Sequence, residues 1–129
     1  KQREQQVAEE NRTKLHIVSN DVEQQTKTLS GGNQQKVIIA RWLESGVNIL
    51  FFDEPTRGID VGAKSEIYDL MRQFTENGGT IVMVSSDLPE LITISDRVIV
   101  MRNGEKVKEV TNRAEITEEN LMHLMIGIQ

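Results

Sequence analysis

The chain has 129 residues, of which 37% are apolar and 27% charged, and its formal net charge is −5. This indicates one globular domain and excludes fibrous or disordered chains, while the acidic balance with dispersed Lys and Arg disfavours nucleic acid as a partner. The longest apolar runs are far shorter than the roughly 20 residues of a membrane-spanning helix. Cysteine is absent, which excludes disulfides, and the widely separated His16 and His123 do not indicate a metal site.

Two helices are predicted in the first third of the chain. Residues 1–15 are polar and rich in helix formers, which predicts a mostly solvated helix, and residues 16–28 show no period and predict a loop. The segment LSGGNQQKVIIARWLESG starts with small residues, carries apolar residues at helical spacing and ends near Gly46. It predicts a helix that begins close to Ser30. The chain also opens at Lys1 in the middle of a helical pattern, which indicates a cut in a longer protein.

The rest of the chain alternates between strands and helices. The run VNILFFDEP is apolar without alternation, which predicts a strand buried on both faces of a parallel sheet. Ile67, Leu70 and Met71 mark the buried stripe of a helix that ends at the glycines of NGG. TIVMVSS predicts a second buried strand and DLPELITIS a short helix with Pro89 in its first turn. RVIVM and KVKEV flank an Asn-Gly turn and predict a hairpin at the sheet edge, after which Thr117 is expected to cap a last helix.

The segment GIDVGAKS, residues 58–65, comes close to the phosphate-binding pattern G-x-x-x-x-G-K-[ST]. Ala63 stands where that pattern requires its last glycine, and Asp60 would place a negative charge among groups that hold phosphate oxygens. The segment also does not follow a buried strand directly. We therefore interpret it as the start of a helix that Asp60 caps, with Lys64 pointing into solvent.

Two acidic residues, Asp53 and Glu54, end the first predicted strand, at the place where open α/β sheets bind ligands. Adjacent residues at a strand end point in different directions, so one acid could hold a hydrated Mg²⁺ while the next orients and deprotonates a water. The alternative is a plain surface turn with two acids before a proline. These residues alone leave both interpretations open.

A second candidate site lies at the start of the predicted helix in LSGGNQQK. Ser30 followed by Gly31 and Gly32 offers a hydroxyl, bare backbone N–H groups and the positive end of the helix dipole, which together suit an anion. The alternative is an ordinary serine-capped helix start after a flexible turn.

In chain order, LSGGNQQK, ILFFDEP, RGID and VSSD resemble the second half of an ABC-type ATPase cassette, from Leu29 to about Met101. The sequence of these motifs is similar to that of the second, carboxyl-terminal cassette in the ATP-binding subunit of bacterial monosaccharide importers of the ribose, galactose and xylose type. The resemblance implies an α/β fold: a partial ABC-ATPase core of parallel strands flanked by helices, then a C-terminal hairpin and helix, with the phosphate-loop half absent. Residues 1–129 would form one partial domain, with 1–45 the remnant of the helical subdomain and 46–129 the Walker B half of the catalytic core.

The resemblance also implies a role for each motif. Asp53 would bind Mg²⁺, Glu54 would be the general base, and Asp60 would reach across a dimer interface. Ser86 stands where the family has its switch histidine, and because a serine cannot contact the γ-phosphate as an imidazole can, hydrolysis at this cassette's own site is expected to be weakened. The residues expected to bind an ATP seated on a partner cassette are Ser30, Gly31, Gly32, Asn33 and Gln34, with Asn33 where the general pattern has Gln.

The implied cofactors are ATP and Mg²⁺. The implied partners are the first cassette of the same subunit, stacked head to tail, and transmembrane permease subunits at the cytoplasmic face of the bacterial inner membrane, with the sugar involved only indirectly. Alone, this piece is expected to be inactive and either marginally stable or self-associating through an unpaired strand edge. Two alternatives stay open: an ABC-type ATPase of chromosome maintenance or DNA repair, whose cassette is split by a coiled coil, and a non-catalytic interaction module.

Overall fold

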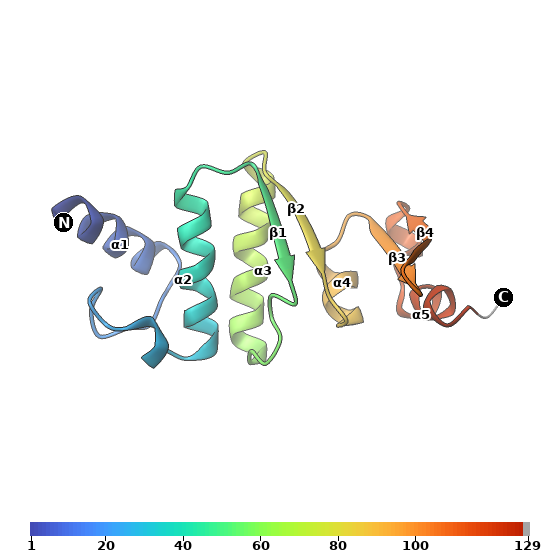
Figure 1. Ribbon diagram of the computed structural model, residues 1–129, viewed down its shortest axis with the longest axis horizontal. Helices are drawn as coiled ribbons and strands as arrows, with labels where there is room; N and C mark the ends of the chain where they lie inside the picture. The colour runs from blue at the N-terminus through green and yellow to red at the C-terminus, as the bar shows by residue number, and fades with distance from the viewer. Residues whose placement is uncertain (128–129) are drawn as a thin grey trace. The chain divides into compact units, whose positions relative to one another are not determined.

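The computed structural model describes residues 1–127, which fall into two compact units that divide after Val84. The first unit contains α1 (Gln2–Lys14), η1 (Thr26–Thr28), α2 (Gly31–Glu44), β1 (Ile49–Asp53), α3 (Val61–Glu76) and β2 (Thr80–Val84) (Figure 1). The second contains α4 (Leu88–Ile94), β3 (Val98–Arg102), β4 (Glu105–Val110), η2 (Arg113–Glu115) and α5 (Glu118–Ile126). The alternating order confirms the predicted α/β class. The division into 1–45 and 46–129, which concerns subdomains of a longer cassette, stays a prediction.

The sheet of the first unit consists of β1 and β2, which run parallel with Ile49 opposite Thr80 and Asp53 opposite Val84. The crossover between the two strands is α3, which packs against the sheet on one side and against α2 on the other (Figure 1). Along β1 the side chains alternate, so that Phe52 is buried whereas Phe51 is 78% exposed. The prediction of a strand buried on both faces is therefore wrong for the described residues, because only one face is covered.

The helix boundaries follow from side-chain and glycine caps. Asp60 Oδ1 accepts a hydrogen bond from the N–H of Ala63 at 3.0 Å and so caps α3, as predicted. At the other end of α3, Gly78 has a φ of +90°, and the N–H of Gly79 donates to the carbonyl of Phe74 at 3.0 Å. This is the left-handed glycine cap that NGG predicts. Lys64, predicted to point into solvent, is half-buried within α3.

The second unit is built around its own hairpin. β3 and β4 pair antiparallel, with a bulge between Val100 and Met101, which confirms the predicted hairpin. Its predicted place at the edge of the first sheet is wrong, because in the described chain β3 and β4 form a separate two-stranded sheet. The physical reason is local packing, since one apolar cluster closes this unit around the hairpin and α5. Its buried members are Val98, Val100, Val110, Ile116 and Leu121.

A buried lysine ties three segments of the first unit together. Lys36 lies on α2 and is only 3% exposed. Its Nζ donates to the carbonyl oxygen of His16 at 3.0 Å and forms an ion pair with the carboxylate of Glu66 on α3. A second tie joins α1 to the far end of α2, where Asn11 Nδ2 donates to Glu44 Oε1 at 2.9 Å. The polar helix α1 is thus held to α2 by a partly buried hydrogen bond, and the segment after α1 is held by the ammonium of Lys36.

We expect Lys36→Ala to lower the free energy of unfolding by about 2–3 kcal/mol, because it removes a buried charge-assisted hydrogen bond and an ion pair together. The check is the midpoint of urea unfolding. The matched control is Lys106→Ala, whose ammonium pairs with Glu109 in a side chain that is 53% exposed, and this change should cost less than about 1 kcal/mol. Equal losses for the two variants would contradict the structural role of Lys36.

Candidate functional site

The start of α2 carries the first cluster of candidate residues. Ser30 has extended backbone angles and is the N-cap residue, and its Oγ accepts from the N–H of Asn33 at 3.4 Å and from Asn33 Nδ2 at 2.8 Å. Ser30 and Gly31 are both exposed. Because the first N–H groups of a helix have no partner within it, this end presents donors outward. The arrangement suits an anion at the end of the helix.

Gly31 and Gly32 are under different packing constraints. A methyl group at Gly32 would lie 2.6 Å from Cβ of Ala63, so the close approach of α2 to α3 requires glycine there. A methyl group at Gly31 would meet nothing within 4 Å, and Gly31 has no positive φ. The fold therefore does not explain Gly31, whereas it fully explains Gly32.

The close approach at Gly32 also brings two of the predicted motifs together. Gly32 faces Ala63 and Ile59, and the N–H of Ala63 is the group that Asp60 caps. The starts of α2 and α3 thus lie side by side (Figure 1). Nothing in the sequence indicated that these two motifs, residues 29–36 and 57–60, meet.

The side chains of Asn33 and Gln34 are engaged within the protein. Asn33 Oδ1 accepts from the backbone N–H of Val18 at 2.9 Å, in addition to the bond that its Nδ2 donates to Ser30. Gln34 Nε2 donates to the carbonyl of Leu29 at 2.8 Å. Both side chains therefore hold the chain around the start of α2, a role that the sequence did not indicate.

The acidic pair ends β1 in two different conformations. Asp53 is exposed and lies on the same face of the sheet as Phe51. Glu54 has a φ of +47°, and its N–H donates to the carbonyl of Val84 at 2.8 Å. A left-handed residue other than glycine costs about 1 kcal/mol or more, and such strain concentrates at functional sites. The turn thus redirects the chain directly after Asp53, and the different roles of the two carboxylates stay a prediction.

The acidic pair suits a magnesium ion that is held partly by the protein and partly by the phosphates of a substrate. Among residues 1–127 no group of three or more His, Cys, Asp or Glu side chains could enclose a metal ion. Magnesium, however, is commonly held by one or two carboxylates together with phosphate oxygens and waters. The exposed carboxylate of Asp53 suits that arrangement.

Ser86, at the predicted switch position, belongs to the second unit and is exposed. Its neighbours form a hydrogen-bonded frame: Ser85 Oγ accepts from the N–H of Asp87 at 3.0 Å and donates to the carboxylate of Glu90. Asp87 in turn caps α4 by accepting from the N–H of Glu90 at 3.1 Å. Glu90 is 2% exposed. The sequence analysis missed Glu90, although the spacing of Asp87 and Glu90 is that of a capping box.

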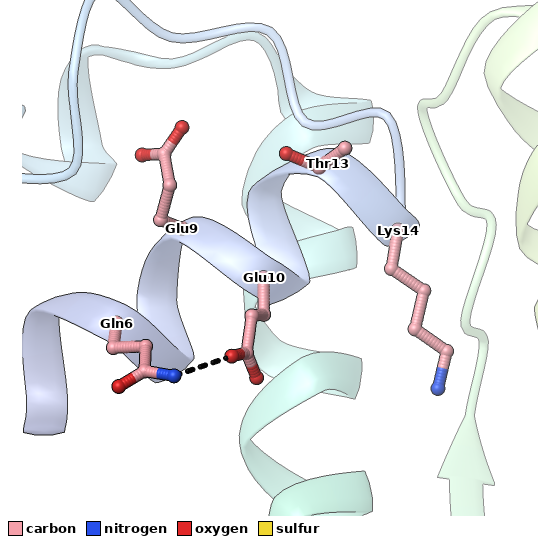
Figure 2. A pocket seen from close by; sticks show the side chains of 5 residues that line it. All are labelled: Gln6, Glu9, Glu10, Thr13 and Lys14. Carbon is pink, nitrogen blue, oxygen red and sulfur yellow. Dashed lines mark hydrogen bonds between the residues drawn. The ribbon is translucent and has the colours of Figure 1, made fainter.

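A surface hollow lies on α1, away from all of these residues (Figure 2). Its lining comes from a single helix, and Gln6 Nε2 donates to Glu10 Oε1 at 3.0 Å within it. Side chains of one exposed helix cannot surround a ligand, so the hollow is not a candidate site. The lining residues are Gln6, Glu9, Glu10, Thr13 and Lys14.

Comparison with known proteins decides the family. The sequence model of the ABC transporter family matches residues 1–57. Ribose import ATP-binding protein RbsA 3 of Rubrobacter xylanophilus is 49% identical over 127 residues, which are 98% of this chain and 26% of that protein. The chain belongs to the ABC transporter ATP-binding family. The resemblance stated from the four motifs is thereby confirmed.

Other members of the ABC family agree. The D-allose import ATP-binding protein AlsA of Escherichia coli is 50% identical over 92% of this chain, and a putative ribose/galactose/methyl galactoside import ATP-binding protein of Geobacillus kaustophilus is 55% identical over 88%. These alignments cover 23% and 22% of the two relatives. The chain thus spans about a quarter of the length of the curated relatives it matches.

Solved structures confirm the fold. The ATP-binding cassette MJ1267 superposes with a TM-score of 0.78 at 23% identity, over 92% of this chain and 48% of that one. A dimeric post-hydrolysis state of the cassette MJ0796, bound to ADP and Pi, gives a TM-score of 0.70 at 29% identity, over 81% of this chain and 45% of that one. The partial ABC-ATPase fold that the motifs implied is therefore correct. In the described part of the chain, no helix has both the length and the apolar character that crossing a bilayer requires.

The two glycines at the start of α2 give a direct test of this geometry. We expect Gly32→Ala to lower the free energy of unfolding by about 1–3 kcal/mol, because the new methyl group overlaps Ala63. Gly31→Ala is the matched change, and it should leave stability equal or raise it by up to about 1 kcal/mol, because alanine favours helix and meets no neighbour. Chemical unfolding of both variants measures the difference, and a larger loss at Gly31 would show that the helix starts are packed differently.

Proposed function

We propose that this chain is part of the ATP-binding subunit of a sugar importer, in which ATP binding and hydrolysis drive uptake of a monosaccharide. The single observation that carries the proposal is about 50% identity to ribose and allose import ATP-binding proteins over nearly the whole chain. The exposed anion-suited start of α2 agrees with it.

In this proposal the start of α2 grips the γ-phosphate of an ATP that is seated on a partner cassette. The hydroxyl of Ser30 and the backbone N–H groups of Gly31 and Gly32 donate to the phosphate oxygens, where preorganised donors stabilise developing charge. The absence of a side chain at Gly31 lets the phosphate approach the backbone closely. For Asn33 and Gln34, whose side chains bond within the protein, we propose a supporting role beneath this surface.

The strand end of β1 serves the other nucleotide site. Asp53 would hold Mg²⁺, which when bound neutralises the phosphate charge of the nucleotide. The carboxylate of Glu54 would orient a water and accept its proton. Asp60 would contribute at the interface between cassettes, next to the start of α2.

The proposed partners follow from the same relatives. They are the first cassette of the same subunit, stacked head to tail, and transmembrane permease subunits at the cytoplasmic face of the bacterial inner membrane. The sugar would meet the permease and not these residues.

The experiment that tests the proposal is ATP hydrolysis by the full-length protein with Ser30→Ala. Removing a donor to the phosphate charge is expected to lower kcat by about 10²-fold. The matched control is Ser45→Ala at the opposite end of α2, where Ser45 Oγ donates to the carbonyl of Trp42 at 2.6 Å, and its kcat should change less than about twofold. Unchanged hydrolysis after Ser30→Ala would contradict the proposed role of this segment.

A second prediction concerns the switch position. We expect Ser86→His to raise ATP hydrolysis several-fold, because an imidazole can contact the γ-phosphate and a serine hydroxyl cannot do so in the same way. The measurement is single-turnover hydrolysis, with Ser86→Asn as the control for side-chain size. A histidine variant no faster than the asparagine variant would remove the argument that Ser86 limits hydrolysis.

A further inference from the structure

The hydrogen bonds that Ser30 accepts leave its hydroxyl one further role, that of a hydrogen-bond donor. A serine hydroxyl has two acceptor positions and one donated hydrogen. Both acceptor positions of Ser30 Oγ are taken by Asn33, through its backbone N–H at 3.4 Å and its Nδ2 at 2.8 Å. The hydrogen of the hydroxyl must therefore point away from Asn33, and Ser30 is exposed at the end of the helix.

Asn33 is itself fixed by the segment before the helix. Its Oδ1 accepts from the N–H of Val18 at 2.9 Å, which orients the amide so that its Nδ2 faces Ser30. One turn further along α2, Lys36 donates to the carbonyl of His16 in the same segment. Asn33 and Lys36, both on α2, thus bond to residues 16–18. Of these two side chains, only that of Asn33 also bonds to Ser30.

We propose that Asn33 is a positioning residue that holds the Ser30 hydroxyl as an outward donor to a phosphate oxygen of ATP. The inference rests on the proposed function, since it concerns the same site. It assigns to Asn33 a role that needs no contact with the nucleotide. It also explains why an amide suits this position: the bond to Val18 needs an acceptor, and the bond to Ser30 needs a donor.

One substitution of equal shape and one truncation test this role. In Asn33→Asp the group facing Ser30 becomes an acceptor, which draws the hydroxyl hydrogen inward while the bond to Val18 can persist. In Asn33→Ala both bonds are lost. We expect each change to lower kcat for ATP hydrolysis by about tenfold or more, with KM for ATP changed less than about twofold, because the lost donation acts on charge that develops in the reaction.

The decisive experiment is a double-mutant cycle in the full-length protein with Ser30→Ala. If Asn33 acts through the hydroxyl, Asn33→Ala should lower kcat by about tenfold in the native background and by less than about twofold once Ser30 is alanine. Ser45→Ala is the control, because the Ser45 hydroxyl donates to the carbonyl of Trp42 at the opposite end of α2 and contacts neither Asn33 nor Ser30. Its effect should be the same in both backgrounds.

Each result of the cycle has a definite meaning. Equal losses for Asn33→Ala in both backgrounds would overturn the inference and leave only a structural role for Asn33, while the proposed function would stand. Native-like kcat in Ser30→Ala would overturn the proposed role of the start of α2 and this inference together. A fall in kcat for Asn33→Ala that vanishes in the Ser30→Ala background supports the inference.

Discussion

The packing of the first unit depends on the buried ammonium of Lys36. A lysine at 3% exposure is tolerated only when its charge is met, and here the carbonyl of His16 and the carboxylate of Glu66 meet it from two different segments. The same contacts set the position of α2 against α3. Once that pair is aligned, Gly32 lies close enough to Ala63 that no larger residue fits.

The functional arrangement follows from this alignment. The starts of α2 and α3 meet, so the segment with Ser30 and the segment with Asp60 share one end of the helix pair. Hydrogen bonds to Val18 and to Leu29 then hold the chain around the helix start through Asn33 and Gln34. Rigid support of this kind matters because donors stabilise charge best when they need no reorganisation.

The sheet side of the first unit has a different character. The outward face of the sheet leaves large apolar side chains exposed. Asp53 ends β1 in this two-stranded sheet, and Glu54, whose backbone is left-handed, follows it. The exposed apolar residues are Ile49, Phe51, Val82 and Val84. Exposed apolar residues and unpaired strands favour association, so the predicted self-association through an edge keeps its physical basis and stays a prediction.

The sequence by itself determined the order of helices and strands, the caps at Ser30 and Asp60, the glycine stop after α3 and the family, because each of these depends on local chemistry or on motif spacing. In residues 58–65 it correctly indicated the start of a helix. Only the tertiary structure decided that Phe51 is exposed, that the hairpin forms its own sheet, and that Gly32, Lys36 and Asn33 bind segments distant in sequence. The reason is that a pattern in the chain reports which face of an element is apolar, but not which element covers it. Likewise, residue types reveal the available donors and acceptors, and only the fold pairs them.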